Sequence, residues 1–292
     1  MTPELAQRGV ETRSEAVYAD AVSENGDAGV IVRLCRYPAL GTAWVWGHLF
    51  RDGAVYGYTH HELPCSSDET EVGADLARYH LSRPGMQIEL VRRGPLLEPE
   101  HGSASARLPL HRGNHPPHGP GEHPGEVTLD FSPDARPVSN LPGRNEMLGR
   151  VTATISIDGE RRSVTWRGHF HEQVQSAPRF TAPFTYLTLR GDGLGLIAIR
   201  VARGTLGQLI RDGRATQIGA LRLAPPGRTR RLALTLADGT PLEGWLETTY
   251  DYSVPVFDTH RPGTLVRGEL GGVSLSGCVN DYLSDQLRYD RF

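Results

Sequence analysis

Two histidines stand in a row of alternating polar side chains near the middle of the chain. Arg167, His169, His171 and Gln173 are each two positions apart, so they share one face if the segment is a β-strand. Histidine can donate a hydrogen bond to a carbonyl or exchange a proton near neutral pH. The row has two interpretations, a solvent-facing row or the polar lining of a cavity in which a substrate is polarised or protonated.

The residues around this row have the pattern of a β-hairpin. Residues 151–157 alternate apolar and hydroxyl side chains, which is the period of a strand that buries one face. Asp158-Gly159 then offers residue types that tolerate the positive backbone angles of a tight turn. The second strand is therefore predicted to begin at about Arg161.

The opposite face of that second strand carries Trp166, Phe170 and Glu172. Glu172 joins a site with the histidines only if a β-bulge re-aims it at the end of the strand. Without such a bulge, we expect Glu172 to be solvated.

Hairpin signals recur along the whole chain. The dipeptide Asp-Gly lies five times between segments rich in β-branched, aromatic or leucine residues, at Asp52-Gly53, Asp158-Gly159, Asp192-Gly193, Asp212-Gly213 and Asp238-Gly239. This spacing predicts an all-β protein of antiparallel hairpins. No segment has a sustained helical period, so any helices are short.

A loop with several prolines divides the chain into two predicted domains, residues 1–145 and 146–292. Within the first, residues 98–125 hold several histidines in a run of Pro, Gly and charge. Closely spaced histidines can bind a metal, but a metal site needs a scaffold that fixes its geometry. We therefore expect a flexible insert at 98–125 and no metal site.

The composition excludes several classes of function. Lys plus Arg number 31 and Asp plus Glu 34, a formal net charge of −3, and the charges are interspersed, so neither a nucleic-acid partner nor an anionic membrane surface is expected. Every basic residue is arginine, which excludes Schiff-base catalysis through lysine. No phosphate-binding glycine loop, dinucleotide fingerprint or nucleophile elbow is present.

The cysteines and the apolar runs predict a cytoplasmic protein without membrane insertion. The three cysteines, Cys35, Cys65 and Cys278, are far apart, which favours a reducing compartment over a disulfide scaffold. The first residues are polar and lack the apolar core of a signal peptide. The apolar runs are shorter than the ~20 residues that span a bilayer.

Three segments resemble the carotenoid hydratase and AttH-like superfamily. They are the hairpin from Gly149 to Glu160 with Trp166-Arg-Gly-His-Phe-His-Glu172 after it, Glu126-Val-Thr-Leu-Asp-Phe-Ser-Pro133, and the closing residues 268–282. The resemblance implies two lipocalin-like antiparallel β-barrel or sandwich domains in tandem, and it covers most of the chain in the order of elements. Some members of that superfamily are natural-product Diels-Alder cyclases.

One departure from the superfamily concerns the histidine row. Many relatives have an Arg-Asp-His-Ser-Trp-Gly-like run after the hairpin, whereas this chain has Gly168-His-Phe-His-Glu-Gln173. His171 matches the histidine of that run and His169 its polar neighbour, but the Asp and the Trp have no counterpart. The fold inference is unaffected by this departure, but the reaction of any one relative does not transfer.

The resemblance implies a cofactor-independent cyclase, isomerase or hydratase that acts on a hydrophobic polyketide, terpenoid or polyene intermediate. An apolar cavity that holds a flexible substrate in its reactive shape can lower the activation barrier by several kcal/mol, up to roughly 7–11. One or two polar groups can then polarise a carbonyl or protonate an alkene. We expect His171 to polarise a carbonyl or donate the proton, with His169, Gln173 and a re-aimed Glu172 in support. Aromatic walls and a polar contact for the substrate are expected from Trp44, Trp46, Trp166, Tyr186, Trp245, Tyr250 and Asn280.

Two other functions remain open at this point. A cupin-type metalloenzyme is suggested by two histidines on one strand, but Glu172 follows His171 directly where a cupin glutamate would come a few residues later. A lipophilic carrier without catalysis also fits lipocalin-like barrels. In each case the expected partner is a hydrophobic small molecule, and the expected state is a monomer or a homodimer.

Overall fold

The computed structural model describes residues 13–96, 98–136, 138–139, 143–176, 179–256 and 259–287. These residues form nineteen β-strands and three short 3-10 helices, η1 (Pro38–Leu40), η2 (Ser67–Glu69) and η3 (Ser284–Gln286). The all-β prediction is therefore confirmed. The chain divides into two compact units, Met1–Ala21 with Val30–Arg179, and Val22–Gly29 with Phe180–Phe292.

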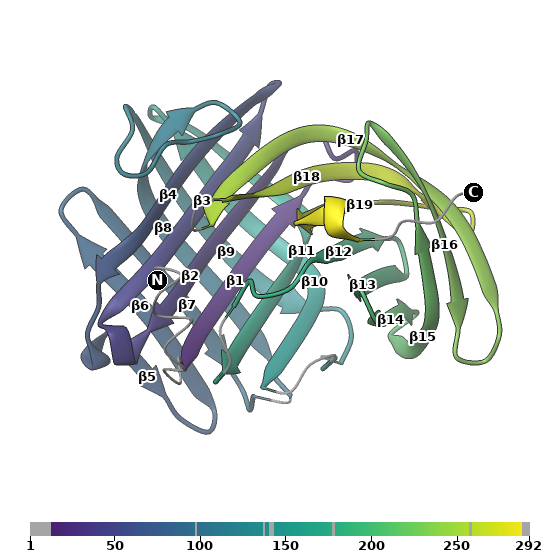
Figure 1. The fold of residues 1–292 in the computed structure, drawn as a ribbon. Helices are drawn as coiled ribbons and strands as arrows, with labels where there is room; N and C mark the ends of the chain where they lie inside the picture. The colour runs from purple at the N-terminus through teal and green to yellow at the C-terminus, as the bar shows by residue number, and fades with distance from the viewer. Residues whose placement is uncertain are drawn as a thin grey trace. The chain divides into compact units, whose positions relative to one another are not determined.

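The first unit is one curved antiparallel sheet of eleven strands (Figure 1). The strands are β1 (Ser14–Val22), β2 (Gly29–Tyr37), β3 (Thr42–Arg51), β4 (Ala54–Pro64), β5 (Thr70–Val72), β6 (Leu76–Arg83), β7 (Met86–Arg93), β8 (His101–Arg112), β9 (His123–Pro133), β10 (Arg144–Ile157) and β11 (Glu160–Gln175). Their order is β4-β3-β2-β1-β11-β10-β9-β8-β7-β6-β5, and a short pairing of β4 with β8 closes the curve. In this order, the first strand of the chain lies beside β11, which carries the histidine row.

One face of this sheet encloses the hydrophobic core of the first unit. Alternate residues of every strand except β5 point into that core, for example Val17 and Ala19 of β1, Val151 of β10 and Phe170 of β11. The intervening residues of β1 and β11 lie on the opposite face. Tyr18, Asp20, His169, His171 and Gln173 are therefore on that opposite face.

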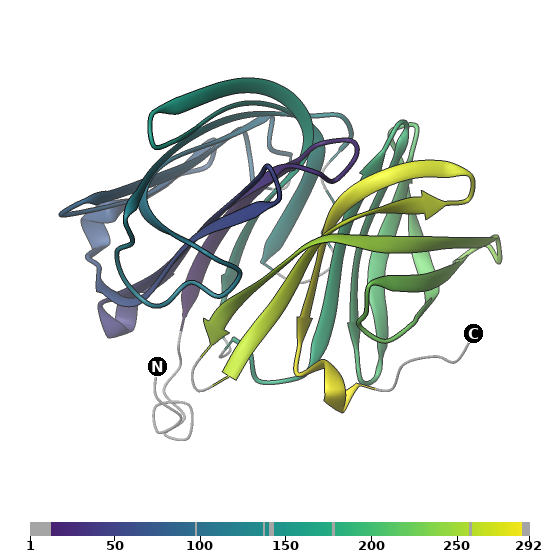
Figure 2. The same ribbon diagram turned by 90° about the horizontal axis from the view of Figure 1, so that it is seen from above.

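The second unit is a closed eight-stranded barrel, drawn in green to yellow in Figure 2. Its strands are β12 (Phe184–Gly191), β13 (Leu194–Val201), β14 (Gly204–Arg211), β15 (Arg214–Leu223), β16 (Thr229–Leu236), β17 (Pro241–Val256), β18 (Thr259–Leu270) and β19 (Val273–Tyr282). Leucine dominates its core. A closed barrel leaves no unpaired strand edge, and the two units together give the tandem lipocalin-like fold.

All five Asp-Gly dipeptides lie between consecutive antiparallel strands, as predicted. Asp52, Asp158 and Asp212 have φ angles of 54°, 53° and 49°, and the glycine after each is also at positive φ. Two central residues at positive φ match the right-handed twist of the flanking strands. These dipeptides therefore fix the register of the hairpins, including the one that carries His169 and His171.

The division between the units differs from the predicted boundary after residue 145. Strand β10 pairs with β9 through residues 149–157, and β11 lies next to β1 in the same sheet. Both strands therefore complete the first unit, which ends at Arg179. The strands on either side of the proline-rich loop, β9 and β10, pair with each other in one sheet, so the chain does not change units there.

The expected flexible insert at 98–125 is wrong. Residues 101–112 form β8. Three of its buried positions are small residues, Gly102, Ala104 and Ala106, and the other two are Leu108 and Leu110. Small residues carry a weak hydrophobic signal, so this alternation does not stand out in the sequence. The loop that follows is also anchored, because the backbone N–H of Gly119 donates to Thr59 O at 3.0 Å.

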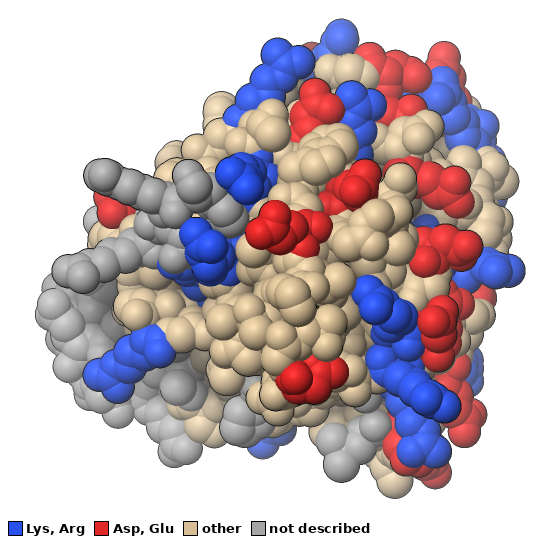
Figure 3. Space-filling view, turned by 90° about the vertical axis from the view of Figure 1, so that its right-hand side faces the viewer, with Lys and Arg blue, Asp and Glu red and all other residues tan. Residues whose placement is uncertain are grey.

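The described residues contain no helix that is long and apolar enough to cross a membrane. On the face shown in Figure 3, arginine and carboxylate side chains are mixed. This mixing agrees with the small net charge.

Candidate functional site

The histidine row is buried on the face of the first sheet opposite its hydrophobic core. His169 is 0%, His171 6% and Gln173 6% exposed. The solvent-facing interpretation therefore does not hold for these three residues. Buried polar groups need hydrogen-bond partners, and the partners of this row come from β1, β10 and the segment after β11.

His171 is held as a neutral imidazole. Arg144 Nη2 lies 3.3 Å from His171 Nδ1, and a guanidinium can only donate, so Nδ1 accepts and the ring proton is on Nε2. No described residue accepts a hydrogen bond from that Nε2–H. Burial, together with the positive charge of Arg144, lowers the pKa of His171 well below its ordinary value. At neutral pH, the group available to a substrate is thus an N–H donor.

The ring of His171 is supported by Tyr18 and Asp20 of β1, which sequence reasoning missed. Tyr18 stacks on His171 with ring centres 5.0 Å apart and planes 7° apart, and its hydroxyl donates to Asp20 Oδ2 at 2.9 Å. Asp20 also accepts from the backbone N–H of His169 at 3.2 Å. Asp20 therefore orients Tyr18 and fixes β1 against β11. The two residues are about 150 positions from His169 and lie in a segment without a recognisable motif.

The side-chain amide of Gln173 is hydrogen-bonded to two arginines. Its Oε1 accepts from Arg144 Nη1 at 3.3 Å and from Arg179 Nη1 at 2.9 Å, and its Nε2 donates to Gln175 Oε1 at 2.8 Å. The amide oxygen therefore orients the two arginines, and a contact of Gln173 with a substrate stays a prediction. Arg144 is also paired with the buried carboxylate of Glu146.

Trp44 and Trp46 are buried on the same face of β3, with ring centres 6.5 Å apart. Trp46 Nε1–H donates to His61 Nε2 at 2.8 Å, and His61 stacks on Trp44 at 4.2 Å. The guanidinium of Arg33 lies 4.2 Å above the ring of Trp46, a cation–π contact. Burial, followed by the charges of nearby cationic groups including Arg33, lowers the pKa of His61 to about 3.

Arg33 of β2 lies over Trp46, on the same face of the sheet as the histidine row. Its positive charge lowers the pKa of His171 as well as that of His61. The two aromatic groups therefore belong to one buried face of the first unit. Arg33 and His61 were absent from the predicted site, because neither stands in a motif.

Glu172 is neither solvated nor part of this face. It points into the core side, where Arg92 Nε donates to it at 2.5 Å and the Tyr79 hydroxyl at 2.6 Å. Burial and the carboxylate charge raise the pKa of Tyr79. Trp166 is half-buried on the same side of β11 against the core. No bulge re-aims Glu172, so the strand alternation separates both residues from His171.

The other predicted substrate contacts lie in the second unit. Tyr250 donates to the backbone oxygen of Asp27 at 2.8 Å, and Asn280 Oδ1 accepts from Tyr252 at 2.9 Å. Tyr186 is opposite Asn280 in the strand register, and Trp245 is 41% exposed. Their contacts with a substrate stay predictions.

No group of three or more His, Cys, Asp or Glu side chains in the described ranges is arranged to hold a metal ion. The cupin-type arrangement requires a carboxylate on the face of the two histidines. Glu172 lies on the opposite face and is bound to Arg92. The residues of this strand therefore do not fit a cupin metal site.

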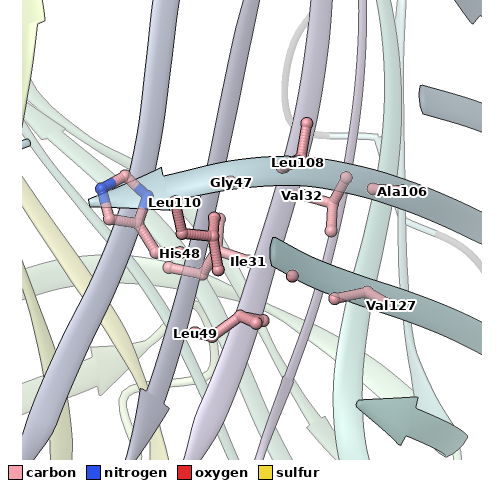
Figure 4. Close-up of a pocket in the computed structure, with 10 residues that line it drawn as sticks. Ile31, Val32, Gly47, His48, Leu49, Ala106, Leu108, Leu110 and Val127 are labelled. Atoms are coloured by element: carbon pink, nitrogen blue, oxygen red, sulfur yellow. The ribbon is translucent and has the colours of Figure 1, made fainter. Parts of the chain in front are cut away.

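A small pocket in the core of the first unit is apolar (Figure 4). It is lined by Ile31, Val32, Gly47, His48, Leu49, Ala106, Leu108, Leu110, Gly125 and Val127. It has room for about one water molecule. This pocket is therefore too small for the predicted substrate.

A family model described as a domain of unknown function (DUF7064) matches residues 5–171. The chain belongs to this family. The match covers more than half of the chain and ends at His171, within β11. No protein of curated function matches the sequence.

Solved structures share the fold over nearly the whole chain. A crystal structure of CghA with Sch210972 has a TM-score of 0.64 at 14% identity and covers 93% of this chain and 88% of its own. A second CghA structure gives 0.59 at 13% identity, with 97% and 90% covered. Kievitone hydratase from Nectria haematococca gives 0.51 at 8% identity, with 92% and 88% covered. These similarities confirm the tandem lipocalin-like fold predicted from the superfamily resemblance.

Proposed function

We propose that this protein is a cofactor-independent cyclase, isomerase or hydratase acting on a hydrophobic polyketide, terpenoid or polyene intermediate of natural-product biosynthesis. The observation that carries the proposal is the buried, neutral His171, whose Nε2–H has no acceptor among the described residues. The shared fold with an enzyme named as a hydratase supports it.

His171 acts as a hydrogen-bond donor to a substrate carbonyl. Its lowered pKa makes the imidazolium scarce at neutral pH, so carbonyl polarisation is favoured over protonation of an alkene. Arg144 fixes the tautomer and Tyr18 fixes the ring plane. A preorganised donor of this kind stabilises a developing oxyanion by roughly 3–4 kcal/mol.

Polarising a carbonyl conjugated with an alkene makes the alkene more electrophilic. A tethered diene can then add to it, which gives cyclisation without a change in mass. Water can add to the same carbon instead, which gives hydration. Both reactions use the same hydrogen-bond donor. Which one occurs depends on whether the substrate carries a tethered diene or admits water to the alkene carbon.

Comparative mass spectrometry of metabolites from cells with and without the gene tests this function. A compound that accumulates without the gene is then incubated with the purified protein. Conversion at unchanged mass identifies a cyclase or isomerase, and the gain of one water identifies a hydratase. A compound that binds and never changes would make the protein a carrier.

His171→Ala is expected to lower kcat about 100- to 1,000-fold, because it removes the donor to the oxyanion. His171→Gln, whose amide can still donate, should retain more activity. The comparison uses initial rates, with circular dichroism as the control for folding. A folded His171→Ala protein with the wild-type rate would exclude His171 from catalysis.

A cytoplasmic location and a monomeric or homodimeric state are part of the same proposal. Cell fractionation tests the first, and light scattering on the eluting protein tests the second. Neither result bears on the role of His171.

A further inference from the structure

Arg179 is a buried cation whose described partners are all neutral. Its side chain is 8% exposed. Nε donates to Ser14 Oγ at 2.8 Å, Nη1 to Gln173 Oε1 at 2.9 Å and Nη2 to the backbone oxygen of Gln173 at 3.4 Å. A guanidinium has five N–H groups, so two of them, one on each Nη, have no described acceptor.

A second arginine lies beside it. Arg144 donates to the same Gln173 Oε1 at 3.3 Å, and its side chain is 9% exposed. Glu146 neutralises Arg144. Asp20, a second buried carboxylate of this face, accepts from Tyr18 and from the backbone of His169, and its Oδ2 lies 3.8 Å from His169 Nδ1.

Two guanidinium groups thus donate to one amide oxygen, and the described partners of Arg179 include no carboxylate. A buried charge without a counter-charge is costly. The positive charge also reaches His171, since Arg144 and Arg179 both lower its pKa. An anionic oxygen group between Arg179 and His171 would balance the charge and use the remaining N–H donors.

The end of β11 approaches the surface close to this group. Gln175 is half-buried and Ser176 is exposed, and both follow Gln173 directly in the chain. The arginines therefore lie close to the surface although they are themselves buried.

We propose that Arg179, with Arg144 and His171, binds a carboxylate or enolate oxygen of an otherwise hydrophobic substrate. The ligand class is an amphiphilic organic anion, and the bidentate fork of arginine suits paired oxygens. This inference rests on the proposed function, because that proposal identifies the face around His171 as the substrate site. It specifies which end of the substrate lies next to the donor on His171.

The test compares two probes that differ only in charge. cis-Parinaric acid is a fluorescent polyene carboxylate, and methyl cis-parinarate is its neutral ester. Each is titrated into the purified full-length protein at pH 8 and low salt. The variants are Arg179→Gln, which keeps hydrogen-bonding capacity without charge, and Arg107→Gln, a control that removes an exposed arginine of the same unit (68% exposed).

The wild type and Arg107→Gln are expected to bind the acid about tenfold or more tightly than the ester, as a charge-assisted hydrogen bond implies. Arg179→Gln should lose this preference and keep its affinity for the ester. If that variant does not fold, Arg179→Lys replaces it, and a reduced preference is expected because the charge stays and the fork is lost.

Equal affinity of the wild type for acid and ester would overturn the proposal, as would a preference that Arg179→Gln leaves unchanged. Failure of the wild type to bind either probe would also overturn it. Acetate that displaces both probes equally well would indicate a site for any small anion and would contradict the amphiphilic class. Because binding is measured without turnover, these results are distinguishable from a failure of the proposed catalytic function.

Discussion

His171 and His61 are in the same chemical situation. Each is a buried imidazole that accepts a hydrogen bond from a group that can only donate, Arg144 in one case and the indole N–H of Trp46 in the other. Protonation of either ring would break its bond and place a charge in a buried site. Both rings are therefore neutral in the folded protein and ionise freely only when it unfolds.

The free energy of unfolding should fall as the pH drops below about 6.5. The unfolded chain binds protons on these histidines in that range, whereas folded His61 stays neutral down to about 3. Each such histidine contributes a slope of about 1.4 kcal/mol per pH unit. Denaturant unfolding between pH 5 and 6.5 measures this slope, in a range where most carboxylates are already ionised.

His61→Gln provides the matched comparison, since the glutamine oxygen can still accept from Trp46. Its unfolding free energy should depend less steeply on pH, by about one proton. Parallel curves for wild type and variant would show that His61 is not buried in the neutral form.

At the level of elements, the site depends on the close approach of β11 to β1. Gly168 makes this approach possible, because a Cβ atom at this position would meet the backbone oxygen of Asp20 and the side chain of Val151. The next residue is His169, whose backbone N–H donates to Asp20. The absence of a side chain at Gly168 therefore lets Asp20 of β1 come close enough to accept the hydrogen bond from His169 of β11.

Gly168→Ala should destabilise the protein by about 1–3 kcal/mol, the usual cost of added volume at a tight contact. Thr165→Ala, at an exposed position of the same strand, is the control. The measurement is urea unfolding together with the amide NMR signal of His169, which should move only in the Gly168 variant. Equal effects of the two substitutions would mean that the contact at Gly168 is not tight.

Local signals in the sequence predicted the elements but not the composition of the site. The Asp-Gly dipeptides and the period of two gave the hairpins and the faces of β11, because both are set by neighbouring residues. Tyr18, Arg144 and Arg179 meet His171 and Gln173 only through sheet order and long side chains, which no local pattern encodes. Glu172 was expected in water because its partner Arg92 is 80 positions away.

At the level of the whole molecule, the second unit includes a short early segment, Val22–Gly29. It is the turn between β1 and β2. Ser276 Oγ donates to Ser23 O at 2.7 Å, Thr249 Oγ1 to Gly26 O at 2.6 Å and Tyr250 OH to Asp27 O at 2.8 Å. The register of β17 shifts between Thr248 and Tyr250, so a bulge directs Thr249 toward this turn.

Replacing residues 23–28 by an Asn-Gly turn should weaken the second unit selectively. Three hydrogen bonds are lost, each contributing about 0.5–1.5 kcal/mol. Hydrogen exchange should become faster in β17, β18 and β19 and stay unchanged in β7, β8 and β9. A control variant with Asn-Gly in place of Pro84-Gly85, between β6 and β7, should leave the second unit unaffected. Unchanged exchange in β17–β19 would show that the turn contributes nothing to that unit.

The placement of Val22–Gly29 also limits how this protein can be recombined. A gene cut after Arg179 would give a C-terminal product with eight barrel strands but without the segment that accepts hydrogen bonds from β17 and β19. To exchange that barrel between relatives, the gene segment for residues 22–29 would have to be exchanged as well. A hybrid of two family members should therefore fold well only when residues 22–29 and 180–292 come from the same parent.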